Sequence, residues 1–155
     1  MEFPRISNGF DQEKIIFDLA DVDFDVEQLV LHRNWLTQVA TTENCDILSL
    51  SYIFCSDQYL HRINVEYLDH DTLTDIITFE LGNPHDENIE GEIYISIDRV
   101  LDNADQMSVD FIMELSRVLV HGLLHLIGYP DKTTEEKEMM RGKEDHYLAL
   151  LDRMS

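Results

Sequence analysis

The chain of 155 residues is long enough for one domain with a single hydrophobic core and too short for two ordinary ones. Its apolar fraction of 44% and charged fraction of 28% exclude a disordered or low-complexity chain. The 32 acidic residues outnumber the 11 basic ones, and this net charge of −21 argues against a protein that holds nucleic acid on an extended basic surface.

The first half of the chain alternates between strand-like and helix-like stretches. A short β-branched run at 15–17 leads into an acidic link, and apolar residues at roughly helical spacing predict a helix over 26–40. The segment DILSLSYIFCS at 46–56 carries apolar residues at period two, which predicts a largely buried strand. A Ser-Asp pair that favours helix initiation then precedes a predicted helix over 57–67.

The second half begins with two strand-like runs, TDIITFEL at 74–81 and GEIYISI at 91–97, which could pair as neighbours across a loop rich in turn residues. A short helix is predicted over 98–106. A long, mostly apolar helix follows, with Ser108 as its expected N-cap and Gly128 as its stop signal.

The last helix is expected to begin at the capping box formed by Thr133 and Glu136. No repeat or linker divides the chain, so we expect residues 1–155 to form a single domain. The order of elements predicts an α+β fold, with a small mixed β-sheet of about four strands and helices packed on it.

The two cysteines, Cys45 and Cys55, match neither a CxxC site nor a disulfide framework, and we expect both to be inert core thiols. There is no signal peptide and no apolar run of about 18 residues, so we expect neither export nor membrane insertion. A cytoplasmic location with reduced thiols is the expectation.

The stretch HGLLHLIGYPD at 121–131 is the strongest indication of chemistry. On a helix, His121 and His125 project from one face, about 5 to 6 Å apart at Cβ, so both can direct a nitrogen at one ion. After the turn that Gly128 allows, Asp131 can return as an oxygen ligand. Two imidazoles and one carboxylate leave a coordination position open, as in catalytic zinc sites, at the end of a central helix.

Two buried core histidines are the alternative interpretation, although burying both without a shared partner costs free energy. A zinc peptidase of the HExxH type is disfavoured, because Gly122 stands where that motif places its general base. The remaining histidines, at 32, 61, 70, 85 and 146, lack ligand spacing and are expected at surface or loop positions.

Three blocks in the same order and spacing resemble the YbeY family of metal-dependent bacterial endoribonucleases, over about residues 47–151. HGLLHLIGY is similar to the family's HGxLHLxGYDH, and GEIYISIDRV resembles its GDIxIS strand. LHRINVEYLDHDTLTDIITFE resembles the stretch that ends in TDVLSF. The matching positions of that block are Asn64, Tyr67, Asp71, Thr74, Asp75 and Phe79.

This sequence departs from the family pattern at several positions, two of which change charged or metal-binding groups. Pro130 and Asp131 replace the family's Asp-His pair, so the third ligand becomes a carboxylate, which zinc accepts. Leu68 stands where the family usually has an arginine, and Leu73 where it has a proline. Leu68 removes the cation expected to face substrate phosphate.

The resemblance implies one Zn²⁺ per chain, held by His121, His125 and Asp131. It also implies a single-stranded RNA substrate, with a part in maturing ribosomal RNA, especially the 3′ end of the small-subunit RNA, and in ribosome quality control. Arg117, one turn before His121, is the first candidate to replace the missing arginine, or else it pairs with Glu114 or another neighbouring acid. Arg62 and Arg99 are the next candidates.

Asp75 is a candidate catalytic residue, as a partner that orients a histidine or as a contact to substrate, or else it is a turn residue that caps a strand. Two other functions stay open. One is a zinc peptidase or other amide hydrolase. The other is a non-enzymatic acidic adaptor that docks on ribosomal proteins.

Overall fold

The computed structural model describes residues 14–69, 74–82 and 87–155. The positions that the sequence singled out at 70, 71, 73 and 85 lie outside these residues. The described elements in chain order are β1 (Ile15–Leu19), a 3₁₀ turn (Val26–Leu29), α2 (His32–Thr42), β2 (Asp46–Cys55), α3 (Asp57–Leu68), β3 (Ile76–Glu80), β4 (Asn88–Ser96), α4 (Ile97–Met107), α5 (Phe111–Ile127) and α6 (Thr134–Met154).

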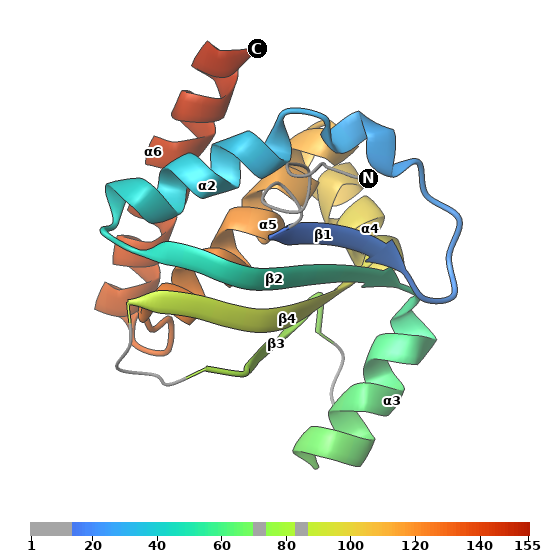
Figure 1. Ribbon diagram of the computed structural model, residues 1–155. Helices are drawn as coiled ribbons and strands as arrows, with labels where there is room; N and C mark the ends of the chain where they lie inside the picture. Colours follow the sequence, from blue (N-terminus) through green and yellow to red (C-terminus); the bar gives the residue numbers. More distant parts are fainter. Residues whose placement is uncertain (1–13, 70–73, 83–86) are drawn as a thin grey trace, which may run out of the picture.

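The strands form one mixed sheet of four in the order β1-β2-β4-β3 (Figure 1). β1 is parallel to β2 and β2 is parallel to β4, whereas β3 is antiparallel to β4. The expected pairing of the two strands on either side of the 82–87 loop is therefore confirmed, as is the α+β class with a small mixed sheet. β3 forms one edge of the sheet.

The two faces of the sheet carry different helices, because successive residues of a strand point to opposite faces. The face of Ile93 meets α5 and carries the main core. The face of Tyr94 carries a smaller cluster beneath α3, which lies across the sheet from α2 (Figure 1). The buried members of that cluster are Cys55, Leu60, Ile63 and Ile77.

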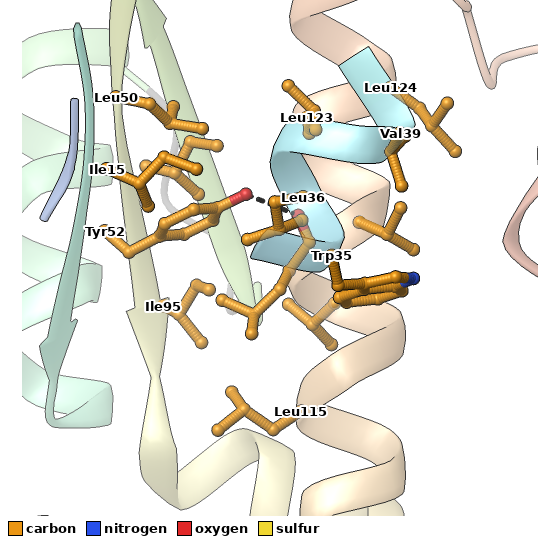
Figure 2. Packing of buried hydrophobic residues seen from close by; sticks show 14 of the residues in the cluster. Ile15, Trp35, Leu36, Val39, Leu50, Tyr52, Ile95, Leu115, Leu123 and Leu124 are labelled. Atoms are coloured by element: carbon orange, nitrogen blue, oxygen red, sulfur yellow. Dashed lines mark hydrogen bonds between the residues drawn. The ribbon is translucent and has the colours of Figure 1, made fainter. Parts of the chain in front are cut away.

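The main core joins β2, α2 and α5, as Figure 2 shows for Trp35, Leu36 and Leu123 around Tyr52. Tyr52 is fully buried, and its hydroxyl donates to the backbone carbonyl of Leu119 at 2.8 Å. A buried hydroxyl needs such a partner, so this bond fixes the position of α5 along the sheet. The core thus places the helix that carries both site histidines.

Two sequence-based predictions about helix boundaries are wrong. The apolar spacing over 26–40 does not form one helix, because a 3₁₀ turn at Val26–Leu29 precedes α2. Ser108 is not the N-cap of α5; it adopts a left-handed conformation at the C-cap of α4, and Asp110 is the N-cap. Two other predictions are confirmed: Gly128 ends α5 with φ 127°, and Thr133 forms the capping box of α6.

Two expectations about single side chains also need correction. His32 is not at the surface, since only 4% of it is exposed, and it packs edge-on against Trp35. Cys55 is buried as expected, whereas Cys45 is only partly so. Among the residues that the structure describes, we find no helix with both the length and the apolarity needed to cross a bilayer.

Candidate metal centre

The two site histidines open onto a cavity of about 560 Å³ between the edge strand β3 and the helices α5 and α6. The cavity is where the end of α5, the turn after it and the first half of α6 come together. Its lining residues are Thr74, Asp75, Ile76, Thr78, Glu114, Arg117, Val118, His121, His125, Asp131, Lys137, Met140, Arg141 and Glu144. All five of the predicted catalytic and metal-binding residues are among them.

His121 and His125 lie one above the other on α5, as their spacing predicted. Their rings are nearly parallel, with 7° between the planes and 6.3 Å between the centroids. Both rings therefore present an edge to the same cavity.

Each of these rings has its Nδ1 atom next to a hydrogen-bond acceptor. His121 Nδ1 lies 2.7 Å from Oε2 of Glu144, and His125 Nδ1 lies 3.2 Å from the carbonyl oxygen of Tyr129. An acceptor at Nδ1 keeps the proton there, so the neutral ring carries its lone pair on Nε2. This is how zinc-binding histidines are usually oriented.

Asp131 approaches the first of these lone pairs. Its Oδ2 lies 3.3 Å from Nε2 of His121. Neighbouring ligand atoms in a tetrahedral zinc site with bonds of about 2.1 Å lie about 3.4 Å apart. The donor types, the ring orientation and the separation of His121 and Asp131 suit a zinc ion. As they stand, no three His, Cys, Asp or Glu side chains in the described ranges are close enough together to hold a metal ion, so binding would require the three predicted donors to draw together.

Glu144 is a site residue that the sequence reasoning missed. It is only 5% exposed, and its two oxygens bind His121 and Arg117, with Nη1 of Arg117 at 2.9 Å. Arg117 also donates to Asp145 at 2.8 Å. The expected ion pair of Arg117 is thus made with α6 rather than with Glu114. A signal was present, because Glu144 falls on the same helical stripe as the buried Met140 and Tyr147.

Charge around His121 favours its protonated form in this arrangement. Burial opposes protonation, but the hydrogen bond and charge of Glu144, together with Asp131 and Asp75, outweigh it and raise the pKa of the ring. The same negative charges would favour a bound cation.

The carbonyl that orients His125 is itself held by a polar cluster centred on Glu43, at the end of α2. Glu43 accepts hydrogen bonds from the hydroxyls of Tyr129 and Tyr147 and from Lys143 Nζ. Burial opposes ionisation of Glu43, but these bonds and the charge of Lys143 outweigh it and lower its pKa. His121 is therefore oriented by a residue of α6, and His125 by a residue, Tyr129, whose hydroxyl binds Glu43 at the end of α2.

Two more carboxylates face the cavity. Asp75 precedes β3, and burial raises its pKa despite the nearby charges of His121 and Arg99. Glu114 is 6% exposed, and burial raises its pKa although Arg117 and Arg141 act against the shift. Because other acceptors occupy the Nδ1 positions of both site histidines, Asp75 is left facing the cavity rather than orienting a ring.

The other candidates for the missing arginine are not among the residues that line the cavity. Arg99 pairs with Asp57 at 2.6 Å, and Arg62 lies over the ring of Tyr59, 5.7 Å from its centroid. At position 122, an added Cβ would lie 2.9 Å from Ile93 Cδ1 and 3.0 Å from Ile76 Cδ1. A side chain at 122 would therefore point at the sheet and not at the cavity, unlike the general base of an HExxH site.

Comparisons with known proteins identify the family of the chain. Residues 15–152 match the family model described as Endoribonuclease YbeY. Two curated relatives carry the same description. The one from Cytophaga hutchinsonii is 52% identical over 139 residues, which are 90% of this chain and 96% of the relative. The one from Amoebophilus asiaticus is 48% identical, over 86% of this chain and 90% of the relative.

A solved structure has a similar fold. The solution structure of a Thermotoga maritima protein superposes with a TM-score of 0.63 at 27% sequence identity, over 86% of each chain.

Proposed function

The chain belongs to the YbeY family of endoribonucleases, and from this premise we propose that it uses one zinc ion to cut single-stranded RNA. The RNA that we propose is ribosomal, at the 3′ end of the small-subunit RNA, with a further part in ribosome quality control. The compartment is then the cytoplasm, where ribosomes are assembled.

The observation that carries the proposal is the pair of Nδ1 contacts, which leaves the Nε2 atoms of His121 and His125 as donors beside Asp131. Two imidazoles and one carboxylate leave a coordination position open for water or substrate. Zinc bound there supplies a Lewis acid that activates water and polarises a phosphoryl oxygen.

The chain's own residues then have separate tasks. Glu144 and the Tyr129 carbonyl hold the two rings in the tautomer that binds a metal. Arg117 neutralises Glu144 and keeps that carboxylate in place. Asp75 lines the same cavity, where its carboxyl would meet the substrate and take up or release a proton.

The test is cleavage of a single-stranded fragment of small-subunit precursor RNA by nuclease-free, zinc-loaded protein. We expect cleavage that a chelator abolishes and zinc restores, with much less cleavage of the same sequence in a duplex. The matched control is His121→Ala, prepared in the same way. Equal cleavage by wild type and His121→Ala, or none by the zinc-loaded wild type, would contradict the proposal.

An amide hydrolase is the less favoured function for two reasons. A side chain at position 122 would face the sheet, and the relatives of this chain are described as endoribonucleases. Chelator-sensitive hydrolysis of a peptide library without RNA cleavage would reverse that order. Contact with ribosomal proteins is compatible with the net charge of −21, since those partners are basic.

A further inference from the structure

The proposed substrate creates an electrostatic problem for this chain. RNA is a polyanion, and a chain with a net charge of −21 repels it at long range. Cations close to the reacting phosphate must therefore supply attraction at short range. Three basic side chains line the cavity, Arg117, Lys137 and Arg141.

Arg117 is already engaged within the fold. Its guanidinium binds Glu144 at 2.9 Å and Asp145 at 2.8 Å, and only 19% of its side chain is exposed. Releasing Arg117 to bind a phosphate would leave Glu144 as a buried charge without its cation, which costs free energy. Arg117 is thus poorly suited to bind substrate directly.

Lys137 and Arg141 are in the opposite situation. Both are exposed, and neither side chain makes an ion pair or a hydrogen bond with any residue in the ranges that the structure describes. Arg141 lines the same cavity as Glu114, and its charge acts to lower the pKa of that carboxyl. Their charges are available to a ligand.

The register of α6 directs both cations to the metal centre. Lys137, Arg141 and Glu144 lie at positions i, i+4 and i+7, which form one stripe along a helix. Glu144 contacts His121, so this stripe faces the two imidazoles. Another stripe of α6, with Met139, Lys143 and His146, lines a different hollow.

We propose that Arg141 and Lys137 bind the backbone phosphates of single-stranded RNA next to the bond that is cut. This assignment rests on the proposed function and gives α6 the substrate-binding role that the sequence assigned to Arg117. The two cations are separated by about 6 Å along the helix axis, so they can contact successive points of one strand. Arg117 is a positioning residue that acts through Glu144.

The experiment compares two double variants that change the net charge equally. Lys137→Gln/Arg141→Gln removes the α6 cations, and Lys14→Gln/Arg153→Gln removes two exposed cations at the ends of the described chain. Glutamine keeps the helix propensity of the three positions in α6, and Lys14 is an exposed turn residue, so we expect both variants to fold, which circular dichroism checks. Binding of a short fluorescein-labelled single-stranded RNA is measured in chelator over a series of salt concentrations, and cleavage with zinc present.

We expect the α6 double variant to have a salt dependence of log K that is shallower by about 1.4, since each phosphate contact contributes about 0.7 for single strands. Its KM should rise about tenfold or more, because hydrogen bonds to charged groups are among the stronger ones. Its zinc content should equal that of the wild type. The control double variant should differ little in slope or KM.

Equal salt dependence and KM in the two double variants, with an active wild type, would overturn the assignment of the α6 cations alone. A shallower slope in Arg117→Gln, with wild-type behaviour of the α6 variant, would transfer the role to Arg117. A wild type that neither binds nor cuts RNA would overturn this inference together with the proposed function.

Discussion

Glu144 links the two charged groups that the sequence singled out on α5. One oxygen binds Arg117 and the other binds His121, while only 5% of the residue is exposed. A buried carboxylate costs free energy unless it is paired, so the three side chains act as one unit. The orientation of His121 therefore depends on a residue of α6 that never needs to touch an ion.

Glu144→Gln tests this dependence. The amide keeps the size of the side chain but loses the charge that holds the proton on Nδ1 of His121, so zinc affinity should fall about 10- to 100-fold. Competition with a zinc-binding dye measures it. The control is Asp145→Asn, which removes the other partner of Arg117 at a side chain that is 60% exposed. Equal zinc affinity in the two variants would contradict the role given to Glu144.

His32 couples the fold to pH. Ser116 Oγ donates to the carbonyl of Ile112, so it accepts a hydrogen bond from Nε2 of His32. The buried Nδ1 of His32 has no hydrogen-bond partner among the residues that the structure describes. Burial lowers the pKa of this ring from 6.5 to about 4. Between these two pKa values the ring is protonated in the unfolded chain and neutral in the folded chain, so the free energy of unfolding decreases as pH falls.

Measuring the free energy of unfolding at a series of pH values tests this effect of His32. We expect His32 to remove up to about 3 kcal/mol from the free energy of unfolding between pH 6.5 and 4, from 1.36 kcal/mol per unit of pKa. Urea denaturation of the wild type and His32→Leu, at constant ionic strength, measures the difference. The exposed His146 supplies the control, His146→Gln. A parallel pH dependence in wild type and His32→Leu would show that His32 does not titrate in this way.

The close packing of α5 on the sheet depends on a glycine in β4. A Cβ at Gly91 of β4 would lie 2.8 Å from Leu126 Cδ1 and 3.0 Å from the backbone oxygen of Phe79. The strand can pack this closely beneath the end of α5 only with glycine there. The helix end that carries His125 is thereby seated against β4.

Two glycine-to-alanine changes should act with opposite sign. Gly91→Ala forces Leu126 or β3 to move and should destabilise the fold by about 1–3 kcal/mol. Gly142→Ala, within α6 and with nothing within 4 Å of the added Cβ, should stabilise it by about 0.5–1 kcal/mol. Urea denaturation measures both. A destabilising Gly142→Ala or a neutral Gly91→Ala would contradict the packing described.

The periodic elements were predictable, whereas their ends were less so. The period of two over 46–56 and the capping box at Thr133 are local patterns, and the structure agrees with both. Ser108 and Asp110 are both residue types that favour helix caps, and they lie two positions apart. The local sequence does not show that α4 extends as far as Ser108, which leaves Asp110 as the N-cap of α5.

Only the site residues that lie close together in the sequence were predictable. The spacing of His121 and His125 on one helix turn shows in the sequence and puts both in one cavity. Glu144 and Glu43 contact the site from 23 or more residues away, so no spacing rule finds them. Their signal was weaker: for Glu144, a carboxylate on the apolar stripe of α6.

At the scale of the whole molecule, basic side chains are scarce and three of the 11 lie at one place. Arg117, Lys137 and Arg141 line the cavity by the edge strand β3, beside both site histidines and four carboxylates. Long-range repulsion of RNA by the net charge of −21 therefore has to be offset at short range, by the cations of this cavity. The matched family model spans residues 15–152, so both the acidic surface and the cavity belong to the family domain.

The zinc content of the purified protein, determined by plasma mass spectrometry, distinguishes a metal centre from a pair of histidines without one. Wild type is compared with His121→Ala, His125→Ala and Asp131→Ala, and with His146→Ala as a control on a different face of α6. We predict about one zinc per chain in wild type and control, and a large loss in the three site variants. A wild type that binds no zinc even when it is supplied, or site variants that keep it, would contradict the metal centre described here.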